Sequence, residues 1–199
     1  MGLQAVLSVA RHVLFFALVI VCVYTDLTRG KLYNWCTLPA LVGGLLLSYA
    51  LGGLLDGGIL GVNLVSSILG LAIAATIFIW PYLRGGIAGG DVKLMLAVAA
   101  IGGAENLFIV YALLYSALIG ALMALLVLIW RGRLREGLKG AVRFTFSARR
   151  LGSKEGETRR LVTGVAVPYG LAISIGSVIA WYVTMLPASG ATVGLIGAC

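Results

Sequence analysis

The chain has 199 residues, of which 61% are hydrophobic and only 11% charged. This composition excludes an ordinary soluble domain, because a core of this size cannot hide so much apolar surface. The net charge of +8 is that of many nucleic-acid-binding proteins, but ten of the fifteen Lys and Arg residues lie in one segment, between positions 131 and 160. We therefore expect a polytopic membrane protein in contact with the lipid bilayer, with no nucleic-acid partner.

Six apolar segments follow one another along the chain. A helix needs about 20 residues to cross roughly 30 Å of hydrocarbon, and the fourth segment is close to the lower limit. The segments cover residues 4–24, 37–55, 59–82, 91–104, 106–130 and 162–186. The sequence thus predicts an all-α membrane bundle of about six transmembrane helices, forming a single membrane-embedded domain over residues 1–199.

Basic residues cluster at every second connection between these segments. Arg29 and Lys31 follow the first segment, Arg84 and Lys93 flank the junction of the third and fourth, and the basic segment 131–161 joins the fifth and sixth. Because Lys and Arg are enriched in cytoplasmic loops, these three connections are predicted to face the cytoplasm. Part of the basic cytoplasmic loop 131–161 is expected to lie on the anionic inner leaflet. A role in substrate recognition is the alternative.

Two ionisable residues lie inside the first apolar segment. Arg11, considered alone, favours an N-terminus inside the cell, but the later basic clusters outweigh it. We expect its long side chain to reach the outer interface. The single histidine, His12, is interpreted as a packing residue and not as a metal ligand.

Two carboxylates are predicted at cytoplasmic helix ends. Asp26 follows the first apolar segment, and Asp91 directly follows Gly89 and Gly90 at the start of the fourth. A charge at the edge of hydrocarbon is costly and usually has a function or a partner. Two carboxylates on one membrane face can share a proton, as in aspartic proteases. The structural alternatives are a helix N-cap for Asp91 and a solvated acid beside Arg29 for Asp26.

The stretch that runs through Gly89, Gly90, Asp91, Val92, Lys93 and Leu94, with Asp26 upstream, resembles the type IV prepilin peptidases, which are membrane aspartyl proteases of the GxGD class. Residues 167–173 resemble a motif of the last helix of that family. Ala88 replaces the first glycine of GxGD, so we expect Gly89 and Gly90 to provide the turn. Supporting residues implied by the resemblance are Asn34, Ala88, Gly89, Gly90, Lys93, Pro168, Tyr169 and Gly170.

The resemblance implies an aspartic-type endopeptidase, with Asp26 and Asp91 catalytic, that needs neither a metal nor another cofactor. Its partner would be a prepilin-like membrane protein, such as a type IV or Flp pilin or a pseudopilin, cleaved at the cytoplasmic face of the inner membrane. Larger family members carry a zinc-binding domain with paired CxxC motifs and also methylate the new N-terminus. The three cysteines, Cys22, Cys36 and Cys199, form no such pair. We expect a small, peptidase-only form, similar to those of tight-adherence pilus systems.

Two other classes of protein also fit a bundle of apolar helices with few acids. A proton-coupled small-solute transporter would use membrane carboxylates, but near the midplane and beside broken helices. A non-catalytic membrane component of a pilus or secretion machine would need neither Asp26 nor Asp91.

Overall fold

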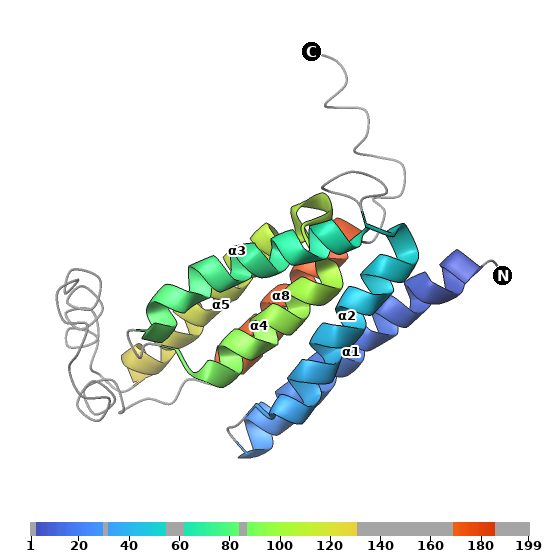
Figure 1. Ribbon diagram of the computed structural model, residues 1–199. Helices are drawn as coiled ribbons and strands as arrows, with labels where there is room; N and C mark the ends of the chain where they lie inside the picture. The colour runs from blue at the N-terminus through green and yellow to red at the C-terminus, as the bar shows by residue number, and fades with distance from the viewer. Residues whose placement is uncertain (1–2, 30–31, 55–61, 84–86, 131–168, 186–199) are drawn as a thin grey trace, which may run out of the picture.

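The computed structural model describes residues 3–29, 32–54, 62–83, 87–130 and 169–185 (Figure 1). In this part of the chain every regular element is a helix. The helices are α1 (Leu3–Arg29), α2 (Asn34–Gly52), α3 (Leu64–Leu83), α4 (Gly89–Gly102), the 3-10 turn η1 (Glu105–Leu107), α5 (Phe108–Trp130) and α8 (Tyr169–Met185). The predicted all-α bundle is confirmed. The predicted basic loop 131–161 and Pro168 lie outside the described residues.

The helices differ in whether they are long enough to cross a membrane. Four helical runs have the length and apolarity to span: α1, α2, α3 and the run Glu105–Trp130, which joins η1 to α5. In contrast, α4 has 14 residues and α8 has 17. A 14-residue helix is about 21 Å long and cannot span alone. Helix α4 lies among the other helices, with Leu94, Val98 and Ile101 fully buried, so protein covers it instead of lipid.

The helices alternate in direction, so that successive connections lie at opposite ends of the bundle. Figure 1 shows the α1–α2 and α3–α4 junctions at one end, together with the last turn of α5 and the first turn of α8. This arrangement agrees with the alternation that the basic residues predict. Which end faces the cytoplasm stays a prediction.

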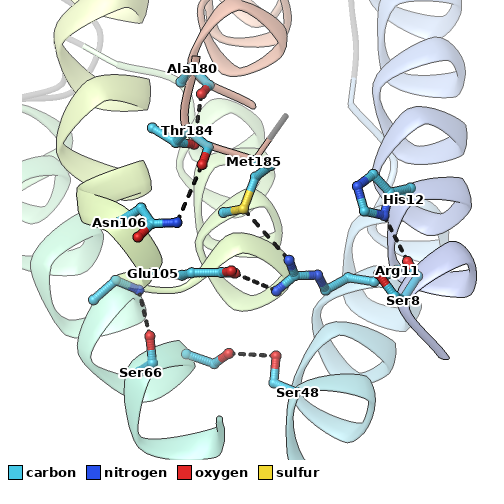
Figure 2. Close-up of polar contacts among 12 residues, drawn as sticks. Ser8, Arg11, His12, Ser48, Ser66, Glu105, Asn106, Ala180, Thr184 and Met185 are labelled. Carbon is cyan, nitrogen blue, oxygen red and sulfur yellow. Dashed lines mark hydrogen bonds and ion pairs between the residues drawn. The ribbon is translucent and has the colours of Figure 1, made fainter. Parts of the chain in front are cut away.

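Arg11 is paired inside the bundle with a residue of the α4–α5 connection, and its place relative to the membrane interface stays a prediction. Its side chain is buried at the end opposite Asp26, and Nη1 donates to Oε2 of Glu105 at 2.6 Å (Figure 2). Its Nη2 lies 3.6 Å from Sδ of Met185. The carboxylate of the α4–α5 connection reaches Arg11 inside the bundle and neutralises it there. His12 packs edge-on against Trp181, with ring centroids 5.3 Å apart, in agreement with a packing role.

Glycines let α2 and α4 approach closely, as small residues do in membrane bundles. A Cβ at position 44 would stand 2.8 Å from Cγ1 of Ile101 and 2.9 Å from the backbone of Ala100 and Ile101. A Cβ at the neighbouring position 43 would instead meet the end of the flexible Leu14 side chain at 3.3 Å. The helix contact therefore depends on Gly44 and tolerates a methyl group at Gly43.

We predict that Gly44→Ala destabilises the protein by about 1–3 kcal/mol, because the α4 backbone must move to make room. Unfolding of the purified protein in mixed micelles by increasing denaturing detergent measures this. Gly43→Ala is the matched control and should unfold close to wild type. Equal unfolding midpoints for the two variants would contradict the close α2–α4 contact.

Candidate active site

Asp91 lies in the first turn of α4. Ala88 is the N-cap, with extended φ and ψ of −72° and 144°, so Asp91 is the third helical residue and not the cap itself. The N-cap interpretation is therefore wrong by three positions, because the helix begins at Gly89. The Asp91 carboxyl makes a hydrogen-bond contact with the backbone of Ala88, as the acid of a capping box does. The side chain is 9% exposed.

The sequence predicts that Gly89 and Gly90 provide a turn with positive φ, and this prediction is wrong. Gly89 and Gly90 are helical, and neither is among the described residues with positive φ. These two glycines instead allow neighbouring side chains to approach the start of α4 closely. A Cβ at position 90 would stand 3.0 Å from Cβ of Leu32, and one at position 89 would stand 3.3 Å from the ring of Tyr82. The missing side chains let the start of α4 lie against its neighbours.

Asp26 lies in the last turn of α1 and faces the first turn of α8. Its carboxyl is in hydrogen-bond contact with the backbone of Leu171, while its Oδ2 is buried and has no partner among the described residues. A Cβ at Gly170 would stand only 2.7 Å from that Oδ2. Arg29 bonds to the Tyr33 hydroxyl at 3.2 Å instead of to Asp26. The interpretation of Asp26 as a solvated acid beside Arg29 is therefore wrong.

The two aspartates lie near each other although they are distant in sequence, because α1, α4 and α8 pack together. The charge of Asp26 acts electrostatically on Asp91, and the charge of Asp91 acts on Tyr169. Tyr169 is half-buried beside α5, where a Cβ at Gly120 would stand 2.6 Å from its ring. Three helices thus contribute to the site: α1 and α4 each carry a carboxylate, and the start of α8 packs against both.

Each carboxylate is close to the N-terminus of a helix, either its own or a neighbouring one. Asp91 is in the first turn of its own helix, and Asp26 faces the first turn of α8. The first N–H groups of a helix have no intrahelical partner and attract negative charge. The N-terminus of α8 matters more for Asp26 than α4 does for Asp91, because Asp26 is at the C-terminal end of its own helix, where the helix dipole destabilises an anion.

Of the predicted supporting residues, Asn34 and Lys93 contact each other. Lys93 Nζ donates to Oδ1 of Asn34 at 2.9 Å, which joins the start of α4 to the start of α2. Both side chains are exposed. Lys93 was predicted to mark the cytoplasmic side and, from the resemblance, to support the motif, and its partner lies on a different helix. Pro168 is not among the described residues.

Two residues near the site were not predicted to be there. Leu32 fills the space between the starts of α4 and α8, with its Cδ1 3.3 Å from where a Cβ of Gly170 would stand. Its position two residues before Asn34 was the available signal. Cys22, buried one turn before Asp26, is in thiol contact with Cys36 on α2. No group of three or more His, Cys, Asp or Glu side chains able to hold a metal occurs in the part of the chain that the structure describes.

The fold and the site together define a multi-pass helical membrane protein with two carboxylates near each other at one end of the bundle. The chain belongs to the type IV leader peptidase family, whose family model matches residues 13–125. This match includes Asp26, Asn34, Asp91 and Lys93 and ends before α8. The protein is therefore a peptidase of the leader-peptidase type. Comparisons with curated proteins and with solved structures found no match.

We predict that Gly170→Ala lowers peptidase activity by about 100-fold. The added methyl group pushes the Asp26 carboxylate away from its position, and a displacement of about 1 Å has an effect of this size. Cleavage of a leader-bearing precursor by the purified variant in detergent measures the effect. Gly43→Ala is the control, since its methyl group meets only the flexible Leu14 side chain away from the aspartates, and it should retain most activity. A fully active, folded Gly170→Ala protein would show that this contact does not matter.

Proposed function

We propose that the protein is an aspartic-type endopeptidase that removes the leader peptide from prepilin-like precursors at the cytoplasmic face of the inner membrane. The observation that supports this most directly is the meeting of Asp26 and Asp91 at one end of an apolar bundle. Membership of the type IV leader peptidase family supports the peptidase class independently of that geometry.

The chemistry follows from two carboxylates that are close together and partly shielded from water. Ionising both carboxylates at the same time is unfavourable, because the two negative charges repel each other. The pair therefore holds one proton between them. The ionised carboxylate takes a proton from a water molecule, whose oxygen attacks the scissile carbonyl carbon. The protonated carboxyl donates to the carbonyl oxygen, and a proton then passes to the leaving amine as the C–N bond breaks. The two aspartates titrate as a unit, so the roles of base and acid belong to the pair.

The position of the site suits a substrate that is polar on one side of the scissile bond and apolar on the other. A prepilin-like precursor has a polar leader followed by an apolar helix. With that helix in the bilayer beside the bundle, the junction reaches the bundle end that carries Asp26 and Asp91. The partner is thus a membrane protein, met within the lipid bilayer.

The placement of polar groups does not favour a proton-coupled transporter. Asp26 and Asp91 lie at the same end, instead of near the midplane beside broken helices. At the opposite end, Arg11 and Glu105 are bonded to each other. Between these ends α4 is lined by fully buried apolar side chains, among them Leu94 and Val98.

We predict that Asp26→Asn and Asp91→Asn each lower leader cleavage by on the order of 10²–10⁴-fold. Neither aspartate can perform the role of the other, so the double variant should be no worse than either single variant. Cleavage of a prepilin-like precursor by protein reconstituted in liposomes measures this, with detergent unfolding as the folding control. Near-normal cleavage by either folded variant would disprove the proposed dyad.

The proposed orientation puts the aspartate end in the cytoplasm. We predict that, in a background without Cys22, Cys36 and Cys199, a membrane-impermeant maleimide labels Leu54→Cys in intact cells. The exposed Thr28→Cys, at the aspartate end, should be labelled only after the membrane is opened, because basic connections stay inside. Labelling of Thr28→Cys from outside would reverse the orientation.

A further inference from the structure

A buried ion pair joins α1 to the rest of the bundle at the end away from the aspartates. Arg11 Nη1 and Glu105 Oε2 are 2.6 Å apart, and the two side chains are only 6% and 15% exposed. The leader-peptidase chemistry has no use for this pair. A buried pair that takes no part in chemistry often fixes how helices are aligned.

Hydrogen bonds hold the backbone around Glu105, the acidic partner, in place. Glu105 begins η1, in the α4–α5 connection. The backbone N–H of Ala104, one residue earlier, donates to the backbone oxygen of Ser66 at 3.0 Å and lies 3.1 Å from its Oγ. One residue later, Asn106 Nδ2 donates to the Thr184 oxygen at 3.3 Å (Figure 2). The residues on both sides of Glu105 are thus tied to α3 and α8, which fixes this part of the connection by contacts that do not involve α1.

In contrast, the surface that α1 presents to the bundle is almost entirely apolar. Its buried residues besides Arg11 are Phe15, Leu18, Val19 and Cys22. Inside a membrane such surfaces gain little from one alignment over another, because lipid and helix are equally apolar. The hydrogen bonds of His12, Thr25 and Thr28 stay within α1. The contacts of Cys22 with Cys36 and of Asp26 with the Leu171 backbone lie at the aspartate end of α1. Away from that end, apolar packing alone leaves the axial position of α1 weakly defined.

The axial position of α1 decides whether the two aspartates meet. Arg11 and Asp26 lie on the same helix, roughly 22 Å apart along its axis at about 1.5 Å per residue. A slip of α1 by one turn would move Asp26 by about 5.4 Å. This exceeds the range of about 2.6–3.2 Å over which a carboxylate holds a water for proton transfer.

We propose that the Arg11–Glu105 ion pair is a register pin: it sets the axial position of α1 and so brings Asp26 level with Asp91. Arg11 and Glu105 are then positioning residues for the peptidase site, and this consequence rests on the proposed function. The pin has no substitute, since α1 has no other Lys or Arg before Arg29. A slipped α1 would leave the Glu105 carboxylate without its partner.

An aromatic cluster lies beside the pin and offers a competing explanation. Phe15 stacks on Trp181 with centroids 4.1 Å apart, and Cζ of Arg11 lies 5.4 Å from the Trp181 ring. Stacked rings can slide while staying in contact, whereas a buried cation that leaves its carboxylate finds no new partner. Replacing Arg11 by methionine keeps the stacking of Phe15 on Trp181 and removes the guanidinium with its ion pair, which separates the two explanations.

The test reads the position of α1 by crosslinking, without using peptidase activity. In the background without native cysteines, Asp26→Cys is combined with Gly170→Cys, where the Cγ of Asp26 lies 3.1 Å from the expected Cβ. Two sulfurs at these places are within disulfide reach. The control pair is Ser48→Cys with Ser67→Cys, whose Oγ atoms are 2.7 Å apart on α2 and α3, so it does not involve α1.

We expect Arg11→Met to slow crosslinking of positions 26 and 170 by roughly tenfold, a usual size for coupling between distant sites. Crosslinking of positions 48 and 67 should keep its rate. The exchanged pair, Arg11→Glu with Glu105→Arg, should restore the first crosslink. With both aspartates present, Arg11→Met should lower kcat for leader cleavage, and the exchange should restore it.

An unchanged 26–170 crosslink in Arg11→Met would overturn the proposal and assign the alignment to Phe15 and Trp181. Slowing of both crosslinks would mean general unfolding, in which case Glu105→Gln is used, since it keeps the shape and removes the charge. An unchanged 26–170 crosslink in that variant also overturns the pin. Failure of the proposed peptidase function would leave the crosslinking result intact, so the two failures are distinguishable.

Discussion

The central constraint on this structure is the cost of placing two carboxylates at the end of an apolar bundle. Desolvated anions need partners, and in the described structure Asp26 and Asp91 are paired with no basic side chain. They rest on helix N-termini instead: Asp91 on the first turn of α4 and Asp26 on the first turn of α8. An arginine partner would hold both acids permanently ionised, whereas backbone N–H groups stabilise charge while leaving a proton free to move.

This constraint explains why the small residues lie where they do. The N-terminus of α8 can approach Asp26 only because position 170 has no side chain, and the start of α4 reaches Leu32 only because position 90 has none. Both glycines belong to the motifs on which the family resemblance is based. Their role is close approach to a carboxylate or to the residue that covers it, and not an unusual backbone angle.

Much of the fold followed from the sequence, because apolar segments of membrane length have few alternatives to helices. The pairing of Asp26 with Asp91 was also predictable, from their shared position at helix ends on one side. The sequence did not predict the partner of Arg11, since Glu105 is distant in the chain and only the packed bundle brings the two together. It also could not show that Leu32 and Gly170 lie against the acids, because the positions of helix starts relative to one another are set by packing and not by local pattern.

The two ends of the bundle solve opposite problems with the same few charges. At one end, like charges are brought together, and among the described residues no cation pairs with them, which is unfavourable for stability and favourable for proton transfer. At the other end, Arg11 and Glu105 are buried and neutralise each other. The connection between them is α1, a single helix that carries one member of each pair. An apolar helix has no intrinsic reason to hold Asp26 near Asp91, where the two carboxylates repel each other when both are ionised, so a favourable contact elsewhere on the same rigid element offsets that cost. The buried arginine of α1 is in the right place to do so.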